Sequence, residues 1–161
     1  MTRHSDTRCI HHSACPLRHS DLHDGDQRNA TDYGAKPAGL WFSVGDGLDW
    51  QALVTARYSP EEIRFQTEVV FFNLTDFLQI GNAAALDAFT TEYGLTRPDG
   101  KQAIDWARVA RNFSGIIIAP HCEERANYNQ TRWYSCWEVS CGCVWAVRAV
   151  KTLRPLNYTE L

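Results

Sequence analysis

The chain has 161 residues, a formal net charge of −3 and a hydrophobic fraction of 44%. This length fits one domain around a single core, and the composition is ordinary for a globular protein. No apolar run approaches the roughly 18 residues of a membrane span, and the first residues lack the apolar segment of a signal peptide. We therefore expect a cytoplasmic protein of one domain, residues 1–161, with no membrane partner.

Charge and cysteine content argue against two further classes. Residues 101–161 hold 8 basic and 5 acidic side chains, against 8 basic and 14 acidic ones in residues 1–100. This asymmetry is too weak to indicate non-specific DNA binding and fits an ordinary solvated surface. The six cysteines are an even number, but the chain is larger than a disulfide-stabilised mini-protein. We expect reduced, mostly buried thiols.

The first half of the chain is predicted to consist mainly of strands. In order, we expect a short strand over 8–13, a long polar loop over 18–36, a strand over 39–44, a helix over 49–58, a strand over 63–72 and a further strand over 76–80. The 63–72 strand is the strongest of these predictions, because its sequence is dense in β-branched and aromatic residues.

The second half contains the helix with the clearest boundaries. Asn82 can cap its start, Leu86 and Phe89 lie on one face, and Gly94 ends it. Beyond it we expect a second helix over 103–113, a buried strand over 115–120, and one or two strands over 132–150.

Together these elements predict an α+β fold, a single domain with mixed or antiparallel sheets and a few helices. We expect flexible ends at residues 1–7 and 155–161, and irregular backbone in the polar loop over 18–36.

Two adjacent histidines lie in the first predicted strand. In extended backbone His11 and His12 point to opposite faces, so one of them looks inward or into a cleft. A neutral imidazole offers one donor and one acceptor, and can therefore fix a ribose hydroxyl or a carboxylate. The alternative is a structural histidine satisfied by hydrogen bonds, and the sequence does not say which of the two faces a site.

The second predicted strand ends on a serine. Trp41 and Phe42 precede Ser43 and can provide a flat surface, and the Gly-Asp-Gly turn at 45–47 permits close approach to the backbone. Neither a phosphate-binding Gly-x-x-x-x-Gly-Lys-Ser/Thr loop nor a dinucleotide-binding Gly-x-Gly-x-x-Gly motif is present. The sequence thus indicates a strand at the edge of a cleft without a common phosphate-binding motif.

The late segment carries a carboxylate among aromatic residues. If it is extended, Trp133, Trp137 and Val139 share one face, while Glu138 lies on the other with Tyr134. Burying Glu138 unpaired would be costly, so it either forms a salt bridge or faces a site. Glu68, in the 63–72 strand, raises the same question.

Cysteine and histidine could also assemble a zinc site. Cys136, Cys141 and Cys143, with His121 or Cys122, supply suitable ligand types. The Cys-x2-Cys turn of common zinc modules is absent, so the sequence favours a site without metal.

The sequence resembles a group of small, mostly uncharacterised bacterial and phage proteins. The resemblance rests on "HHS" at 11–13, "KPAGLWFS" at 36–43 and "WYSCWEVSCGCVW" at 133–145, and it extends from about Cys9 to Val150. The order of these motifs is also similar, more loosely, to that of the ADP-ribosyltransferase fold.

The looser resemblance implies an NAD-dependent ADP-ribosyltransferase, or an NAD glycohydrolase if water is the acceptor. It implies that His11 and Ser13 hold the NAD ribose and nicotinamide amide, that Trp41, Phe42 and Ser43 line the nicotinamide pocket, and that Glu138 is catalytic. The acceptor of ADP-ribose, whether protein, nucleic acid or nucleotide, is not implied.

A second hypothesis is a non-catalytic nucleotide- or protein-binding module. In that case Trp133, Trp137 and Trp145 would form an aromatic binding surface, although aromatic residues at such spacings more often belong to a core.

Overall fold

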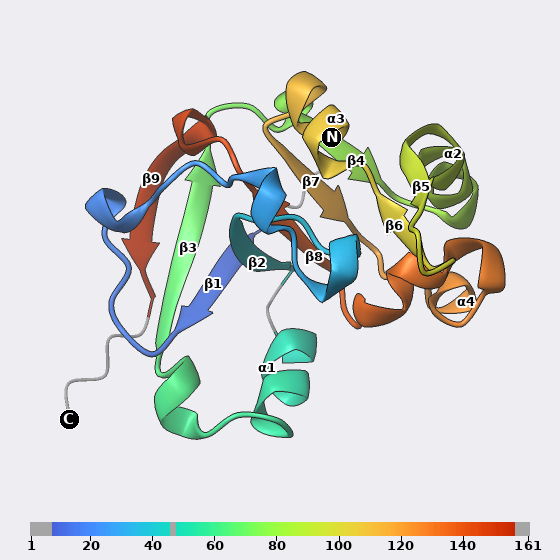
Figure 1. Cartoon of the computed structure of the whole chain (residues 1–161). Coiled ribbons are helices and arrows are strands. Elements are labelled where there is room, and N and C mark those ends of the chain that lie inside the picture. The colour runs from blue at the N-terminus through green and yellow to red at the C-terminus, as the bar shows by residue number, and fades with distance from the viewer. Residues whose placement is uncertain (1–7, 46–47, 157–161) are drawn as a thin grey trace, which may run out of the picture.

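The computed structural model describes residues 8–45 and 48–156. It shows a mixed α+β domain with a curled, mostly antiparallel sheet of seven strands, ordered β4-β7-β8-β2-β1-β3-β9, and a separate hairpin of β5 and β6 (Figure 1). Only β4 and β7 pair in parallel within the large sheet. The predicted α+β class is therefore confirmed.

The described strands are β1 (Cys9–Ser13), β2 (Leu40–Val44), β3 (Phe65–Phe71), β4 (Phe77–Ile80), β5 (Gly94–Thr96), β6 (Gln102–Ile104), β7 (Gly115–Ile118), β8 (Cys141–Val144) and β9 (Val150–Pro155). The described α-helices are α1 (Leu48–Thr55), α2 (Ala83–Tyr93), α3 (Trp106–Asn112) and α4 (Glu123–Ala126). Each strand predicted before residue 120 is present. The predicted 103–113 helix is shorter, because its first residues belong to β6.

The two faces of the sheet pack against different cores. Phe42 lies in one core with aromatic residues of β3 and β4, whereas Trp41, its neighbour on β2, packs against the core that α2 and α3 cover. This follows from the alternation of side chains along a strand. The strand β2 therefore separates the two cores, and one of its faces looks toward α2 and α3.

Helix α2 follows its sequence signals closely. The side chain of Asn82 accepts a hydrogen bond from the backbone N–H of Ala85 at 2.8 Å, which satisfies one of the donors at the start of the helix. Leu86 and Phe89 are its buried residues, and Gly94 is its C-cap. All of these predictions are confirmed.

The prediction of extended backbone over the whole of 132–150 is wrong in its first part. Residues Asn129–Cys136 form a 3-10 segment, η6, and regular strand begins only at Cys141. Alternation would put Trp133 and Tyr134 on opposite faces, but they are 2% and 0% exposed and both enter the same core. A 3-10 segment allows this, because with three residues per turn neighbouring side chains lie about 120° apart instead of pointing to opposite sides as in a strand. The physical reason is burial of large aromatic area.

Two indole hydrogen bonds attach the turn at 31–36 to this core. The Nε1–H of Trp106 donates to the carbonyl oxygen of Gly34 at 2.9 Å, and the Nε1–H of Trp137 donates to that of Ala35 at 3.1 Å. Buried indole donors require such partners. The turn is thus held in place by residues more than 70 positions away in the chain.

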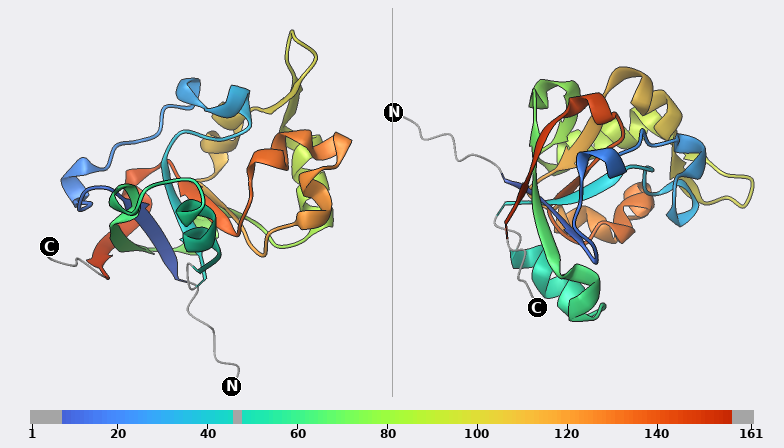
Figure 2. Two further views of the ribbon diagram at one scale, coloured as in Figure 1. Left: turned by 90° about the horizontal axis from the view of Figure 1, so that it is seen from below. Right: turned by 90° about the vertical axis from the view of Figure 1, so that its left-hand side faces the viewer.

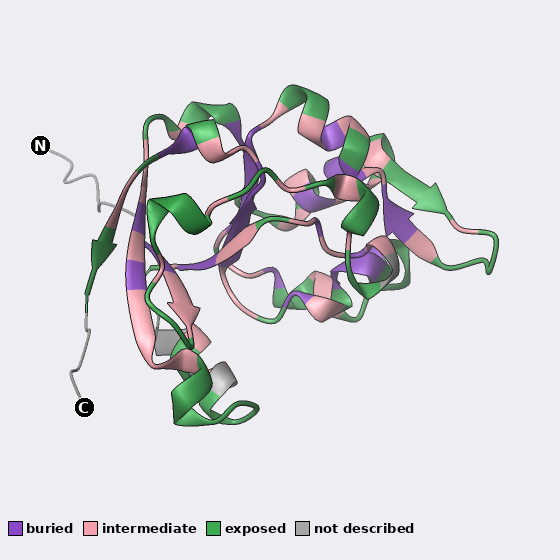
Figure 3. Ribbon diagram, turned by 60° about the vertical axis from the view of Figure 1, so that its left-hand side comes forward, coloured by how far each residue is buried: buried purple, intermediate pink, exposed green. Residues whose placement is uncertain are grey.

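The 18–36 region consists of irregular backbone with three short 3-10 turns, His19–Asp21, Gln27–Asn29 and Asp32–Gly34. Of the predicted flexible ends, residues 1–7 and 157–161 lie outside the described residues, whereas Pro155 ends β9 and pairs with Thr67. Helix α1 and the turn after it project from the ends of β1 and β2, apart from the other helices (Figures 1 and 3). In the described part of the chain, no helix has the length and apolarity to cross a membrane.

The close approach of β8 to its neighbours yields a stability prediction. A Cβ added at Gly142 would lie 2.6 Å from both the carbonyl oxygen of Ile116 and the ring of Phe42. Replacement by alanine should therefore lower the free energy of unfolding by about 1–3 kcal/mol, as overpacking does elsewhere. Gly81→Ala is the matched control, because its added Cβ would meet nothing nearer than 3.8 Å. Urea denaturation of both variants checks this, and equal midpoints would contradict it.

Candidate functional site

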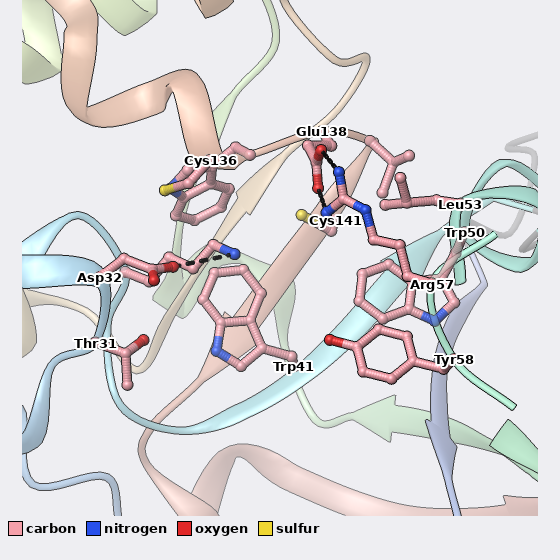
Figure 4. A pocket seen from close by; sticks show the side chains of 13 residues that line it. Thr31, Asp32, Trp41, Trp50, Leu53, Arg57, Tyr58, Cys136, Glu138 and Cys141 are labelled. Atoms are coloured by element: carbon pink, nitrogen blue, oxygen red, sulfur yellow. Dashed lines mark hydrogen bonds and ion pairs between the residues drawn. The ribbon is translucent and has the colours of Figure 1, made fainter. Parts of the chain in front are cut away.

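A hollow of about 280 Å³ lies on the β2–β8 face of the sheet, which we call the aromatic hollow. It is formed by the turn at 31–36, strands β2 and β8, helix α1 with the turn after it, and the residues that follow η6 (Figure 4). Its lining residues are Thr31, Asp32, Lys36, Trp41, Trp50, Leu53, Arg57, Tyr58, Cys136, Trp137, Glu138, Val139 and Cys141.

The carboxylate of Glu138 forms a two-pronged ion pair in this hollow. One guanidinium nitrogen of Arg57 donates to Glu138 Oε2 at 2.5 Å, and the other donates to Oε1 (Figure 4). The two side chains are 54% and 33% exposed, so the pair is reached by solvent. The sequence left two alternatives for Glu138, a salt bridge or a site; in the structure it forms the salt bridge and also lines the hollow.

A second ion pair lies at the opposite wall. The ammonium of Lys36 lies 3.4 Å from Asp32 Oδ2 and 5.7 Å from the ring centroid of Trp41. A cation over an indole face is attracted by the ring quadrupole. Trp41 also meets Trp137 edge-on, at a centroid distance of 4.9 Å. Its ring is thus held by two neighbours while it lines the hollow.

The indole of Trp50 carries an unpaired donor. Its Nε1–H is buried and has no acceptor among the described residues. An unmade hydrogen bond of this kind costs about 1–3 kcal/mol. A ligand acceptor that reached Trp50 would remove this cost.

His12 lies next to Trp50, with ring centroids 5.9 Å apart, and its Nε2 lies 3.5 Å from Ser43 Oγ. Burial and the neighbouring His11 lower the pKa of His12 to about 4, so its ring is neutral near pH 7. His11 points elsewhere. Its Nδ1–H donates to the carbonyl oxygen of Trp41 at 2.7 Å, since a carbonyl can only accept. His12 is therefore the histidine beside the hollow.

The thiols of the hollow are poor nucleophiles. Burial raises the pKa of Cys136, and it raises that of Cys141 to about 12. A thiol in this state is protonated near neutral pH, and only the thiolate reacts readily. The chemistry of the hollow therefore falls to its carboxylates and cations.

The structure places the sequence-predicted site residues in two groups. Trp41 and Glu138 line the aromatic hollow, whereas His11, Ser13, Phe42 and Ser43 do not. The exposed fraction of Ser43 is 2%, and its hydroxyl donates to the carbonyl oxygen of Ile10 at 3.2 Å.

Ser13 and Phe42, like His11, are also engaged elsewhere. The hydroxyl of Ser13 donates to the carbonyl oxygen of Cys15, and Phe42 is buried in the opposite core. Of the residues proposed to hold NAD, only Trp41 thus lies in the hollow itself.

The sequence analysis missed the residues that helix α1 and its following turn contribute. Trp50, Leu53 and Arg57 have the spacing of one helix face, and that pattern could have indicated a shared wall. No local sequence pattern could have indicated that Arg57 forms an ion pair with Glu138, because the two residues are 81 positions apart.

The other candidates from the sequence have structural roles. Glu68 pairs with Arg8 at 3.3 Å and with Arg154 at 3.7 Å. In the described part of the chain, no group of three or more histidine, cysteine or acidic side chains is placed to hold a metal. All six cysteines lie within that part, and none is in a disulfide.

The proposed aromatic surface of Trp133, Trp137 and Trp145 is wrong. These residues are 2%, 1% and 4% exposed and form the core beneath α2 and α3. Trp133 packs against Phe89 and Trp137, and Trp145 packs against Trp106. These rings therefore offer a partner almost no surface beyond the part of Trp137 that lines the aromatic hollow.

Comparison of the chain with protein-family models, with curated proteins and with solved structures gave no significant match in any of the three. The functional argument therefore rests on the geometry of the hollow.

The neutral state of His12 predicts how stability depends on pH. The pKa of His12 falls from its ordinary 6.5 to about 4 on folding, and that of His11 is lowered as well. Between these values the unfolded chain binds more protons than the folded one. The free energy of unfolding is therefore highest, as far as these two histidines decide it, above about pH 6.5, where they are neutral in both states. It decreases as the pH falls toward 4, because protons then bind preferentially to the unfolded chain.

Urea denaturation across pH 4–7 measures this effect. We expect His12→Gln to reduce the loss of stability on acidification, with His11 accounting for part of what remains. The exposed His23 provides the matched control, and His23→Gln should leave the slope unchanged. An identical slope for wild type and His12→Gln would contradict the assignment.

Proposed function

We propose that the chain is an NAD-dependent ADP-ribosyltransferase, and that the nicotinamide end of NAD binds in the aromatic hollow beside Trp41 and Glu138. The observation that carries the proposal is the position of the Glu138 carboxylate, partly exposed on the wall of a hollow with aromatic sides. Transfer to water instead of an acceptor would make the same site an NAD glycohydrolase.

The arrangement of the sheet supports an ADP-ribosyltransferase-like fold. The three motifs of the resemblance are far apart in the sequence, but β1 and β8 both pair with β2. The first two motifs supply β1 and β2, and the third contains Glu138 and, from Cys141, the strand β8. A site built from all three would lie where these strands meet, as the aromatic hollow does.

The size and walls of the hollow suit one flat ring with its sugar. Its volume of about 280 Å³ is near the lower end of the range for small-ligand pockets, so a whole dinucleotide would extend beyond it. Trp41 and Tyr58 offer aromatic surface to a pyridine ring.

In the proposed reaction the bond between the ribose C1′ and the nicotinamide nitrogen breaks, and its electron pair leaves with nicotinamide. The remaining sugar carries the positive charge of an oxocarbenium ion. Glu138 would stabilise this charge and accept a hydrogen bond from a ribose hydroxyl. An acceptor nucleophile or water then bonds to C1′ and loses its proton.

The ion pair with Arg57 leaves Glu138 able to accept a further hydrogen bond from a ribose hydroxyl. A carboxylate has about four lone-pair sites, and the two hydrogen bonds from Arg57 use two of them. A ribose hydroxyl can therefore bind Glu138 while Arg57 stays in place and fixes the orientation of the carboxylate.

The decisive variant is Glu138→Gln. We expect nicotinamide release from NAD to fall by two or more orders of magnitude, because the amide is neutral. Binding of NAD, measured by calorimetry, should stay within a few-fold of wild type. The free energy of unfolding should change by no more than about 1 kcal/mol, since the ion pair that is lost is exposed.

Glu92→Gln is the matched control, because it breaks a comparably exposed ion pair, with Arg108, outside the hollow. It should leave release unchanged. Repeating the assay with a crude cell extract shows whether an acceptor accelerates release. Wild-type protein that neither releases nicotinamide nor binds NAD would refute the proposal.

A second candidate function is nucleotide binding without catalysis. The observation that favours it is the Arg57–Glu138 pair itself, because the guanidinium neutralises the charge that the reaction needs. This function predicts that NAD binds without release of nicotinamide, and that Glu138→Gln and Glu92→Gln bind it equally well.

A further inference from the structure

A second hollow, which we call the basic cleft, adjoins the aromatic hollow and is not used by the proposed chemistry. Its volume is about 540 Å³, and it lies between the β5–β6 hairpin and the segment η6. Asp32 and Cys136 line both hollows, so the two share a wall. The hairpin projects from the body of the domain in both views of Figure 2.

The charge of the basic cleft is positive. Arg97, Lys101 and Arg132 line it, against the single carboxylate of Asp32. That carboxylate already lies 3.4 Å from Lys36, on the side of the aromatic hollow. Arg97 also pairs with Asp99 at 3.1 Å, which offsets one of the three cations. The lining of the basic cleft thus holds more basic than acidic side chains, which favours an anionic ligand.

The walls of the basic cleft are fixed by the side chain of Gln102. Its Nε2–H donates to the carbonyl oxygen of Gln130 at 2.8 Å, and its Oε1 accepts from the backbone N–H of Trp133 at 3.3 Å. These bonds join the hairpin to η6. At the hairpin tip, the N–H of Arg97 donates to the carbonyl oxygen of Lys101 at 2.8 Å. The cations are therefore mounted on connected backbone, which lowers the ordering cost of binding.

We propose that the basic cleft binds the diphosphate of the nucleotide whose flat ring enters the aromatic hollow. This inference rests on the proposed function for the identity of the ligand. The two hollows are neighbours at Asp32 and Cys136, and the aromatic hollow is too small for a dinucleotide, so the rest of such a ligand would extend past these two residues toward the basic cleft. Arginine and lysine are the side chains that bind phosphate oxygens best. Polar Asn129 and Ser135 offer further hydrogen bonds.

The test uses ADP, which has the diphosphate but no nicotinamide, and measures its binding to the full chain by calorimetry. Lys101→Gln combined with Arg132→Gln should weaken ADP binding at least about tenfold, because two charge-assisted contacts are lost. The salt dependence of ADP binding should also become shallower. Both side chains are exposed, so the double variant should fold, which circular dichroism checks.

Arg111→Gln combined with Arg148→Gln is the matched control. It removes two exposed cations that line neither hollow and should leave ADP binding unchanged. Equal loss in both double variants would refute the basic cleft as the site, as would unchanged binding in the Lys101/Arg132 variant.

The same measurements separate failure of this inference from failure of the proposed function. ADP binding that depends on Lys101 and Arg132, without nicotinamide release by wild type, would support the basic cleft and remove the enzymatic proposal. Nicotinamide release by wild type, with a KM for NAD that is unchanged in the double variant, would support the enzymatic proposal and remove the basic cleft as the diphosphate site. A short single-stranded oligonucleotide that binds through these residues when ADP does not would overturn the diphosphate assignment.

Discussion

The candidate site depends on two hydrogen bonds from buried indoles to consecutive carbonyls. Trp106 and Trp137 donate to Gly34 and Ala35, and each buried donor would otherwise lose about 1–3 kcal/mol. The turn that accepts these bonds has little regular structure of its own, yet it carries Asp32, which lines both hollows. The aromatic core therefore determines where the polar groups of the site stand. A site on a turn gains its precision from the rigid core beneath it.

The strand β2 shows how one short sequence serves two purposes. Phe42 enters one core, while Trp41, one residue earlier, turns its ring to the aromatic hollow. Ser43 returns to the Trp41 face, but it is buried, and its hydroxyl donates to the carbonyl oxygen of Ile10 on β1. A polar residue at the end of a strand can thus satisfy a buried neighbour instead of a ligand. The same sequence pattern fits both outcomes.

The sequence predicted those elements whose signals are local. Helix α2 has a cap at Asn82 and a stop at Gly94, and both act within a few residues. Segment η6 was missed because an aromatic-rich run satisfies a strand pattern and a tight helical pattern equally well, and burial against α2 decides between them. Glu138 was singled out by the cost of burying a carboxylate, which is also local. Its partner Arg57 could not be predicted, because only the tertiary fold brings them together.

The position of Cys136 has a practical consequence. Its sulfur lies in the wall common to both hollows, half-buried, whereas Cys15 is exposed and the other four thiols are buried. A thiol reagent would label Cys15 first and Cys136 next, and Cys136 slowly, because burial raises its pKa and a reagent reaches it only through one of the two openings. Anything that fills one opening leaves the other as the remaining route to this sulfur. The chain thus carries a native chemical reporter whose labelling kinetics register occupancy of either side.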